Sequence, residues 1–480
     1  MLIGGTVANL KTIREPKVVN PNIFREYDIR GIADVDLVDE TASLIGKALG
    51  TFLRRDNRKS IVVGRDVRLT SGRLRDAIVA GLNSTGMDVI DVGMVPTPAS
   101  YFAILHYQAD GGIMITGSHN PIEYNGFKMS KNIGSISAIF GQDIQHLKQL
   151  IDNEDFEIGE GKVETRDIVP EYTSALKERI QIGKKLKIVI DAGNGTGGEI
   201  GPKLFEDLGC EVVRLYCELD GTFPNHLPDP TVPKYVKDLI AKVKEHNADA
   251  GIGFDGDSDR VGVIDNLGRM IYADKLLAMF AADTLTREPG SDIVFDVKCS
   301  QALPEMIKKS GGKPFMWKTG HSILKAKMKE LHSPLAGEMS GHIFINDGYF
   351  GYDDGIFSAG RLLQILANSG KTLAELHDEI PAFESTPEIR VECTDEEKFD
   401  IVDELVAAFK KEYEVIDVDG ARVQFGDGWG LVRASNTQPV LVLRFEAKSD
   451  ARLREIVAIF KNELDRYSSV KYSKDDFYGY

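Results

Sequence analysis

The chain has 480 residues, a formal net charge of −16, and an ordinary globular composition with 42% hydrophobic and 28% charged residues. This length exceeds what one hydrophobic core can hold and indicates about three or four domains. The acidic balance argues against a nucleic-acid partner, because a phosphate backbone requires a basic surface. An anionic small molecule stays open as a ligand, since the side chains lining a site set its local field.

We expect no membrane segment and no secretory signal, because the chain lacks a long apolar run and its N-terminus lacks an apolar core. The cysteines lack paired metal-ligand spacing, which is typical of reduced thiols in cytoplasmic proteins. They are Cys210, Cys217, Cys299 and Cys393. The sequence therefore predicts a cytoplasmic protein.

The first predicted elements follow a loose N-terminal leader and a polar segment at 24–31. An amphipathic helix is expected at about 41–53, then a buried strand at 60–66, a helix at 73–84 and a second strand at 88–93. After another helix, a third apolar strand leads into the loop Thr116-Gly117-Ser118-His119-Asn120-Pro121. The order is β-α-β-α-β, with the loop at the end of the third strand.

This order recurs twice. Strands are expected at 186–191, 211–215 and 248–254, the last running into Asp255-Gly256-Asp257-Ser258-Asp259-Arg260. They are expected again at 292–297, 313–317 and 333–336, before Gly337-Glu338-Met339-Ser340-Gly341-His342. Short apolar strands alternating with helices favour mixed or parallel sheets covered by helices. Because chemistry in such folds gathers at strand ends, the repetition predicts a triplicated α/β architecture around one cleft.

The last part of the chain has a different pattern. Strands at 386–391, 421–425, 429–433 and 440–446, with helices at 396–412 and 451–467, indicate a smaller α+β domain. We therefore predict three similar mixed-sheet α/β domains and a C-terminal α+β domain, with boundaries at 1–164, 165–268, 269–381 and 382–480.

Ser118 lies between a glycine and a histidine just after an apolar strand. The glycine lets the backbone bend and a substrate approach the hydroxyl, as a nucleophile or phosphate carrier requires. Taken alone, such a hexapeptide is more often a simple polar turn. We expect Ser118 to be presented to a substrate rather than buried.

Asp255, Asp257 and Asp259 place three carboxylates at alternate positions after a buried strand. Oxygen ligands of this kind suit Mg²⁺. A calcium loop of the EF-hand type fits less well, because Arg260 replaces its turn glycine and Asn266 its bidentate glutamate. A solvated polar loop is the remaining alternative.

Other segments carry groups that suit a phosphosugar. The run Arg433-Ala434-Ser435-Asn436-Thr437 offers a guanidinium, hydroxyls, an amide and backbone N–H groups, as in an anion-binding nest. Glu338 with Ser340 suits the recognition of vicinal hydroxyls, and Lys128 and His342 are candidates for proton transfer. Further cationic or hydroxyl groups near strand or loop ends are Tyr27, Arg30, Lys298 and His321.

The run at 193–198 matches the dinucleotide fingerprint G-x-G-x-x-G, with Glu218 at a suitable distance for a ribose contact. The corresponding positions of the other two units do not repeat it. We interpret it as a structural turn, and a dehydrogenase is the alternative.

With these motifs in order, the chain resembles the α-D-phosphohexomutase superfamily, and most closely its phosphomannomutase/phosphoglucomutase branch. The resemblance covers essentially the whole chain and rests on four motifs, at 116–121, 255–260, 337–342 and 433–437. It implies four domains around a deep central cleft, with the fourth closing over the substrate.

The resemblance also implies roles for single residues. Ser118 is similar to the serine that carries the phosphate, and together with Asp255, Asp257 and Asp259 it would hold Mg²⁺, with Arg260 assisting the phosphoryl group. Glu338 and Ser340 would bind sugar hydroxyls, and Lys128 matches a proton-transfer residue. The non-transferred phosphate would bind Arg433, Ser435, Asn436 and Thr437, and the remaining substrate contacts would be Tyr27, Arg30, Lys298, His321 and His342.

The expected activity is that of an isomerase, a reversible phosphate transfer between C1 and C6 of mannose or glucose through a phosphoserine and a 1,6-bisphosphate. Hexose 1,6-bisphosphate is the expected activator, and a monomer without nucleic-acid or membrane partners is expected. Phosphoglucosamine mutase is the alternative enzyme, although Met339 in the sugar loop favours sugars with a 2-hydroxyl. A non-catalytic phosphosugar sensor and a phosphatase that uses the serine also stay open.

Overall fold

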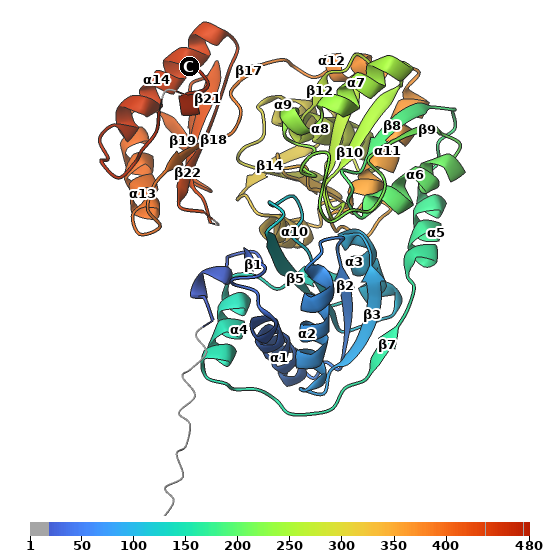
Figure 1. Cartoon of the computed structure of the whole chain (residues 1–480). Helices are drawn as coiled ribbons and strands as arrows, with labels where there is room; N and C mark the ends of the chain where they lie inside the picture. The colour runs from blue at the N-terminus through green and yellow to red at the C-terminus, as the bar shows by residue number, and fades with distance from the viewer. Residues whose placement is uncertain (1–18, 437, 474) are drawn as a thin grey trace, which may run out of the picture.

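The computed structural model describes residues 19–436, 438–473 and 475–480. Within these residues the strands form four sheets, each belonging to one successive part of the chain (Figure 1). We refer to these parts as units I to IV. None of the described helices is long and apolar enough to cross a membrane.

Unit I has the largest sheet, with the strand order β1-β5-β4-β2-β3-β7 and β6 paired to β5. Its strands are β1 (Ile29–Ile32), β2 (Ser60–Arg65), β3 (Asp88–Met94), β4 (Gly111–Ile115), β5 (Tyr124–Asn132), β6 (Ile136–Ala138) and β7 (Val163–Thr165). Its helices are α1 (Asp39–Arg55), α2 (Ser71–Asn83), α3 (Thr97–His106) and α4 (Gln142–Asp152).

Units II and III have the orders β12-β11-β10-β8-β9 and β14-β13-β15-β16. Unit II contains β8 (Lys187–Asp191), β9 (Glu211–Leu215), β10 (Ala250–Phe254), β11 (Val261–Asp265), β12 (Met270–Ile271), α5 (Val169–Arg179), α6 (Gly197–Asp207) and α7 (Lys237–His246). Unit III contains β13 (Asp292–Asp296), β14 (Lys313–Trp317), β15 (Leu335–Gly337), β16 (Ile343–Ile345), α8 (Ala273–Arg287), α9 (Ala302–Lys309), α10 (His321–Glu330), α11 (Gly355–Ser369) and α12 (Leu373–Asp378).

The three sheets share one four-stranded pattern, which confirms the predicted α/β class. The patterns are β3-β2-β4-β5, β9-β8-β10-β11 and β14-β13-β15-β16. In each, the first three strands are parallel and the last is antiparallel. The sequence predicted the parallel strands but not the antiparallel one. As a result, each functional loop lies in the connection between the third parallel strand and its antiparallel neighbour.

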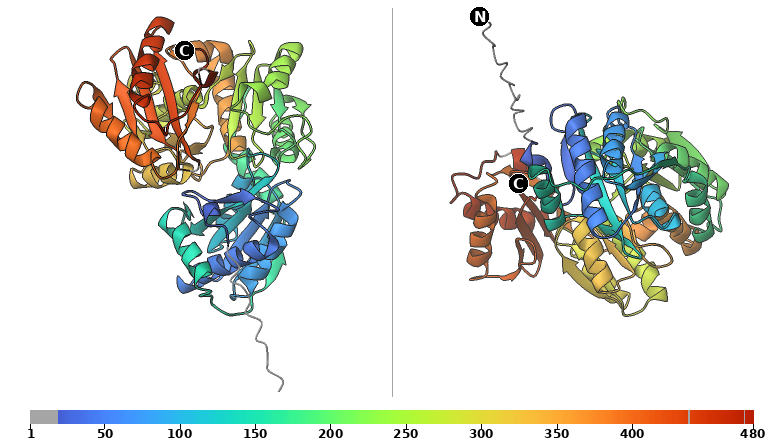
Figure 2. Two further views of the ribbon diagram at one scale, coloured as in Figure 1. Left: turned by 60° about the vertical axis from the view of Figure 1, so that its left-hand side comes forward. Right: turned by 90° about the horizontal axis from the view of Figure 1, so that it is seen from below.

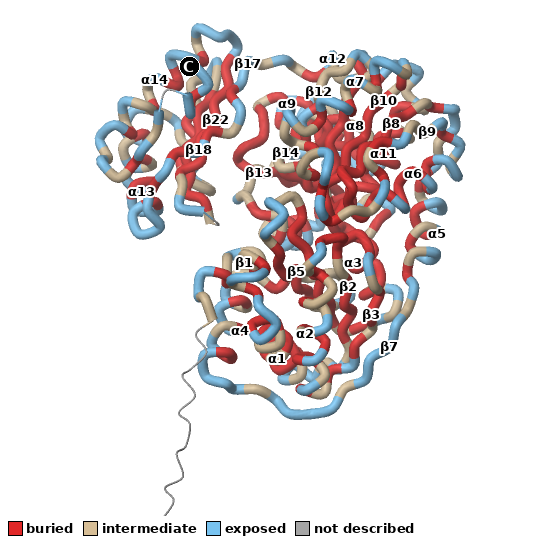
Figure 3. The backbone as a smooth tube through the Cα atoms, in the orientation of Figure 1, coloured by how far each residue is buried: buried red, intermediate tan, exposed pale blue. Residues whose placement is uncertain are grey.

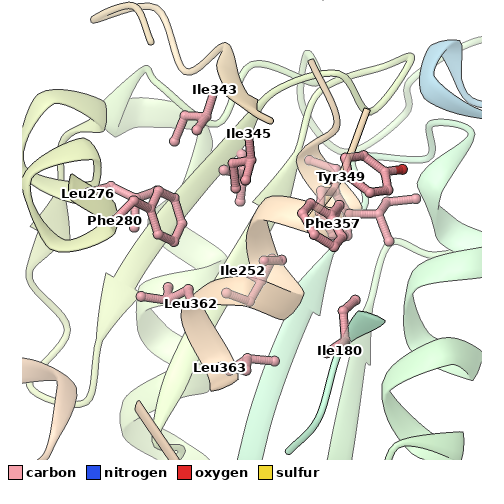
Figure 4. Close-up of a cluster of buried hydrophobic side chains, with 14 of the residues drawn as sticks. Ile180, Ile252, Leu276, Phe280, Ile343, Ile345, Tyr349, Phe357, Leu362 and Leu363 are labelled. Atoms are coloured by element: carbon pink, nitrogen blue, oxygen red, sulfur yellow. The ribbon is translucent and has the colours of Figure 1, made fainter. Parts of the chain in front are cut away.

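Units I to III share a continuous core. One cluster of buried side chains includes Val62 of β2, Ile252 of β10 and Phe295 of β13. Helix α11 lies in the middle of this core, and Leu362 and Leu363 lie near Ile252 and Leu276 (Figure 4). Buried positions therefore continue from one of these units into the next (Figure 3).

Unit IV has its own core. Its sheet has the order β17-β22-β21-β20-β19, with β18 also paired to β22. The elements are β17 (Glu384–Ser385), β18 (Ile389–Glu392), β19 (Glu414–Ile416), β20 (Ala421–Gln424), β21 (Gly428–Ala434), β22 (Val440–Ala447), α13 (Lys398–Phe409) and α14 (Asp450–Leu464). Helices α13 and α14 cover one face and enclose a separate cluster of buried residues. Figure 2 shows this unit beside units I and III.

Candidate active site

Ser118 lies at the meeting point of units I and II. Its Oγ donates a hydrogen bond of 2.8 Å to Asp255 Oδ2 and lies 3.2 Å from Nδ1 of His119. The residue is 2% exposed, so the expectation that it would not be buried is wrong. The loop of unit II covers it, since a Cβ at Gly256 would come within 2.6 Å of the Ser118 carbonyl oxygen.

The backbone of Ser118 has a φ of 49°, in the left-handed region that residues other than glycine rarely adopt. Its N–H donates to Thr116 Oγ1 at 2.8 Å, and Gly117 N–H donates to Asp66 Oδ2 at 2.9 Å. These bonds fix the backbone of the strained turn. The Ser118 hydroxyl is therefore held in a position from which it reaches Asp255.

Asp255, Asp257 and Asp259 are buried, and one oxygen of each lies within 4.8 Å of the others. Burial and the two neighbouring carboxylates raise the pKa of Asp255 well above its ordinary value. Thr97 donates to Asp257 Oδ2 at 2.6 Å. The cluster is therefore a buried group of carboxylates in contact with the Ser118 hydroxyl, and their mutual repulsion disfavours the charged form of Asp255.

Lys128 of β5 reaches this cluster from unit I. Its ammonium donates to Asp257 at 2.7 Å and also to Asp259. Burial alone would lower the pKa of Lys128, but the surrounding aspartates outweigh it and raise the pKa. The side chain is therefore charged in this arrangement and offsets part of the aspartates' repulsion.

Arg260 and His342 join units II and III. Arg260 Nε donates to His342 Nε2 at 2.9 Å, and the two residues also form an isolated β-bridge. His342 Nδ1 lies 2.9 Å from Asp353 Oδ2. Its ring stacks on that of His321, with centroids 5.2 Å apart, and burial lowers the pKa of His321 well below the ordinary value.

The sugar-loop residues of unit III also connect. Glu338 accepts hydrogen bonds from Gly320 N–H at 2.6 Å and from Ser340 Oγ at 2.9 Å. Glu338 thus ties the loop at 337–342 to the start of α10, where His321 lies. Lys298 Nζ lies 3.0 Å from Glu388 of unit IV.

Unit IV completes the arrangement with the loop after β21. Arg433 Nε donates to Asp419 Oδ2 at 2.9 Å, and Asn436 Nδ2 donates to Tyr27 Oη at 2.5 Å. Tyr27 Oη donates in turn to the carbonyl of Thr319 at 2.9 Å. Arg30 Nη1 reaches the Thr116 carbonyl at 3.3 Å. Ser435 is buried in the same loop, whereas Thr437 and the leader at 1–18 lie outside the described residues.

Comparison with known proteins decides the family. Models of the phosphoglucomutase/phosphomannomutase alpha/beta/alpha domains I, II and III match residues 21–157, 170–268 and 272–383, and the model of the C-terminal domain matches 388–463. A phosphomannomutase/phosphoglucomutase of Pseudomonas putida is 48% identical over 452 residues, which cover 94% of this chain and 97% of the relative. The chain belongs to the phosphoglucomutase/phosphomannomutase family.

Two further members are close to this chain. A phosphoglucomutase of Neisseria meningitidis is 44% identical over 449 residues, or 92% of this chain and 97% of its own length. The crystal structure of a phosphoglucomutase/phosphomannomutase family protein from Burkholderia thailandensis superposes with a TM-score of 0.89 at 43% identity, covering 95% of this chain and all of the other. Family membership and fold therefore extend over the described molecule.

The donor set of this phosphohexomutase fits a metal ion. Asp257 Oδ1 and Asp259 Oδ1 are buried and accept no hydrogen bond among the described residues. Unsatisfied carboxylate oxygens in a dry site carry a large desolvation cost, which a hard cation offsets. The three aspartates can therefore hold a divalent metal beside the Ser118 hydroxyl.

The glycine loop at 193–198 has a structural role, as interpreted from the sequence. A Cβ at Gly195 would lie 2.7 Å from the Gly256 carbonyl oxygen, and one at Gly197 would lie 2.6 Å from Ser258 Oγ. Thr196 N–H donates to the same Gly256 carbonyl at 3.1 Å. The glycines therefore let the start of α6 pack directly against the loop at 255–260, which we call the metal loop. This loop covers the N-terminus of α6.

Sequence reasoning missed several supporting residues, above all Arg68. Its buried guanidinium donates to the carbonyls of Ser118, Asn120, Pro121 and Tyr124, in and just after the Ser118 loop, at distances of 2.6 to 3.0 Å, and it lies 3.5 Å from Asp66. One signal was available in the sequence, because β2, β8 and β13 each end in an aspartate or are followed by one, at Asp66, Asp191 and Asp296. Asp66 and Asp296 each accept a backbone N–H from their unit's functional loop.

Proposed function

We propose that this protein is a phosphomannomutase/phosphoglucomutase that reversibly transfers a phosphoryl group between C1 and C6 of mannose or glucose phosphates. The observation that carries the proposal is the 2.8 Å hydrogen bond from Ser118 to Asp255 within the buried aspartate cluster. It places a hydroxyl that can carry a phosphoryl group beside a site for a cation that can neutralise it. The named relatives support the same activity.

In the first half-reaction, the free hydroxyl of a hexose monophosphate attacks the phosphorus of phospho-Ser118. The bond from phosphorus to Ser118 Oγ breaks as the bond to the sugar oxygen forms; the hydroxyl proton of the sugar passes to a base, and Ser118 Oγ takes up a proton as it leaves. Lys128 and His342 are the proposed proton-transfer residues. Because Lys128 is charged in this arrangement, it must first give up its proton, and because His342 Nε2 already accepts from Arg260 Nε, that bond must open before His342 can take the proton.

In the second half-reaction, the bisphosphorylated sugar turns over and returns its other phosphoryl group to Ser118. This step requires a site that accepts phosphate at either end. Arg433, Ser435, Asn436 and Thr437 are proposed to bind the non-transferred phosphate, and Glu338 and Ser340 the sugar hydroxyls. Additional contacts are proposed for Tyr27, Arg30, Lys298, His321 and His342. Hexose 1,6-bisphosphate is the proposed activator, since it rephosphorylates Ser118.

We propose Mg²⁺ as the metal, held by Asp255, Asp257, Asp259 and the phosphoryl group on Ser118. When bound, it supplies charge neutralisation for the transferring phosphoryl group. Arg260 is proposed to assist, because its backbone N–H donates to Asp255 Oδ1 at 3.1 Å and its guanidinium lies next to His342.

We also propose the coarser properties predicted from the sequence. The domains are proposed to be 1–164, 165–268, 269–381 and 382–480, in a monomeric cytoplasmic enzyme. The four cysteines are buried and free, which supports a reducing compartment.

The test is turnover of mannose 1-phosphate, glucose 1-phosphate and glucosamine 1-phosphate, with Mg²⁺ and a trace of hexose 1,6-bisphosphate. We expect conversion of the first two to their 6-phosphates without steady release of inorganic phosphate. Conversion of glucosamine 1-phosphate alone would show a phosphoglucosamine mutase instead. Steady phosphate release would show a phosphatase, and binding without turnover a sensor.

Ser118→Ala provides the matched variant. We expect it to lose more than about 10⁴-fold in kcat, because covalent transfer has no other acceptor, while its melting temperature stays close to that of the wild type. Substantial mutase activity in this variant would overturn the phosphoserine mechanism.

A further inference from the structure

The sheet of unit IV has two faces of opposite character. Side chains along a strand alternate between faces, and one set, including Ala421, Val423 and Phe445, fills the core beneath α13 and α14. The alternate positions of the same strands hold Arg422, Trp429, Arg433, Arg444 and Glu446, all buried. Charged side chains are buried on a sheet face only where something else covers that face and pairs with them.

The cover is the loop at 297–301 of unit III, which carries Lys298. Arg422 donates to the carbonyls of Val297 and Cys299, the latter at 2.7 Å, and Arg444 donates to the carbonyl of Lys298 itself. Glu446 Oε1 accepts from Gln301 N–H at 2.8 Å. Three side chains of unit IV thus bind four backbone groups of one five-residue loop.

The contact between the unit IV sheet and the loop at 297–301, which we call the joint, is closely packed. The Arg422 guanidinium stacks on Trp429 with its carbon 3.7 Å from the ring centroid, and Trp429 Nε1 donates to Glu446 Oε1 at 2.9 Å. Val297 packs against Trp429 and Leu431. Arg422, Trp429 and Glu446 are each at most 2% exposed. Since these bonds are shielded from water, they fix the loop's conformation more firmly than exposed bonds would.

Unit III binds mainly the N–H groups of this loop. Asp274 at the start of α8 accepts from Ser300 N–H at 2.9 Å and lies 3.5 Å from Arg444 Nη2. Val297 N–H donates to Trp317, and Cys299 N–H donates to Asp296, but the carbonyls of 297, 298 and 299 all point to unit IV. Unit IV therefore supplies the donors for the carbonyls around Lys298, while unit III accepts from the neighbouring N–H groups.

We propose that Arg422 and Arg444 are positioning residues that couple the docking of unit IV to the placement of the Lys298 ammonium toward the substrate phosphate. This inference rests on the proposed function, since Lys298 is a proposed substrate ligand. When unit IV docks, the two guanidiniums draw the carbonyls of the loop into one arrangement and Lys298 is set. When unit IV moves away, the carbonyls lose their donors and the Lys298 ammonium loses its contact with Glu388, so Lys298 loses its fixed position.

A purely structural joint is the competing explanation. It would hold the two units together without any special relation to Lys298. The two explanations differ in how a joint variant combines with a variant at Lys298, because mutations that act through one residue are not additive.

The experiment is a double-mutant cycle in the full chain, with Arg444→Met, Lys298→Met and the double variant, assayed with glucose 1-phosphate. We expect Arg444→Met alone to lower kcat/KM by about 10- to 100-fold, as a misplaced ligand does. In the Lys298→Met background the same change is expected to cost less than about threefold. Arg444→Lys is expected to recover part of the activity, because one ammonium can reach the Lys298 carbonyl. Equal effects of Arg444→Met in both backgrounds would overturn the proposal.

Hydrogen exchange tests the proposal without requiring turnover. It can also distinguish a local change in the loop from a general loss of stability in a variant. We expect Arg444→Lys and Arg422→Lys to increase amide exchange in 297–301 while leaving exchange in β13 unchanged. Unchanged exchange in 297–301, or equal increases throughout unit III, would also overturn the proposal. If the wild type itself fails to turn over phosphosugars, the proposed function fails, but this exchange comparison still decides whether unit IV sets the loop.

Discussion

At the scale of single residues, the reactive groups depend on buried partners that hold them in place. Ser118 adopts a strained backbone conformation, and Arg68 holds the loop around it by four carbonyl contacts. Gly117 is required there, because a Cβ would lie 2.1 Å from Arg68 Nε. The loop's shape is therefore specified by one buried guanidinium whose charge Asp66 balances.

Replacing Arg68 should disable the enzyme through Ser118. Arg68→Lys keeps the charge near Asp66 but cannot reach four carbonyls, so we expect kcat to fall by about 100-fold. Arg68→Met would leave Asp66 unpaired and should lower the free energy of unfolding by about 3–5 kcal/mol. Steady-state kinetics and urea unfolding measure the two effects.

Arg55→Lys is the matched control for this substitution, because Arg55 pairs with exposed Asp155 and Glu157. We expect it to leave kcat within twofold of the wild type, as exposed ion pairs contribute little. Equal kcat values for Arg68→Lys and Arg55→Lys would show that the loop holds Ser118 without Arg68.

At this scale the sequence predicted the candidate reactive residues better than the residues that hold them in place. Ser118, the three aspartates and Arg433 stand in local motifs whose residue types indicate phosphate or metal binding. Arg68 and Asp353 stand in no such motif. Arg68 acts through contacts with residues 50 or more positions away, and Asp353 through its contact with His342. Neither contact is visible in a local pattern or spacing. The burial of Ser118 was missed for the same reason, because the loop that covers it comes from unit II.

At the scale of elements, the loop before α6 supports the metal site through close backbone packing. Gly195→Ala would place a Cβ 2.7 Å from the Gly256 carbonyl and 2.9 Å from its Cα, and both are backbone atoms. The metal loop must therefore shift, and we expect the Kd for Mg²⁺ to rise by about 10-fold or more. Calorimetric titration with Mg²⁺ measures this change.

Gly183→Ala controls for the substitution, since no heavy atom lies within 4 Å of its added Cβ. It should bind Mg²⁺ as the wild type does.

Titration of the wild type with NAD should show no binding, because the glycine loop packs against protein. Unchanged Mg²⁺ affinity in Gly195→Ala, or saturable NAD binding, would contradict this view of the loop.

Helix α11 begins at a buried carboxyl with an unusual pKa. Asp354 caps the helix by accepting from Phe357 N–H at 2.8 Å, and it also accepts from the hydroxyls of Tyr349 and Tyr172. Burial outweighs these bonds and raises the pKa of Asp354 from its ordinary value of 3.8 to about 6. Between these values the folded protein holds a proton that the unfolded chain has released.

Stability should therefore fall as the pH rises from about 4 to 6, by up to about 3 kcal/mol from this group, and then level off. Asp354→Asn cannot ionise, so we expect the difference in unfolding free energy between wild type and variant to change over this range and stay constant above it. Urea unfolding at intervals of half a pH unit measures the difference. A constant difference from pH 4 to 7 would show that Asp354 has an ordinary pKa.

The elements themselves were predicted well where a pattern is local. Strands at 211–215 and 313–317 match β9 and β14 residue for residue. The antiparallel strands β5, β11 and β16 were missed, because they follow polar loops and break the alternation of strand and helix. In β5, Lys128 is buried by pairing with carboxylates of unit II, a contact that no local hydrophobic pattern contains.

At the scale of the whole molecule, one core cluster spans units I to III, which also have smaller clusters of their own, whereas the core of unit IV is separate. Unit IV joins the others through the small apolar cluster around Trp429 and through polar contacts at the site. Interfaces of this kind permit relative motion of domains. We therefore expect unit IV to be the part that closes over the substrate, as the sequence analysis predicted.

Tyr27 is the side chain that links three units at this closure. Its hydroxyl donates to the Thr319 carbonyl of unit III and accepts from Asn436 of unit IV. Burial raises the pKa of Tyr27 to about 12, so the hydroxyl keeps its proton at neutral pH and can serve both partners. Tyr27→Phe removes both bonds and leaves the ring in place.

We expect Tyr27→Phe to raise KM for glucose 1-phosphate by about 10-fold while changing kcat less, because two lost hydrogen bonds of about 1 kcal/mol each weaken the closed form rather than the chemistry. Small-angle scattering with and without substrate should show a smaller compaction than in the wild type. Tyr216→Phe is the control, since its hydroxyl contacts exposed Asp238 on unit II. If Tyr27→Phe lowers kcat alone, the hydroxyl acts in the transfer step. If both variants change KM equally, the change in KM is not specific to Tyr27. In either case closure must depend on the joint around Arg422 and Arg444.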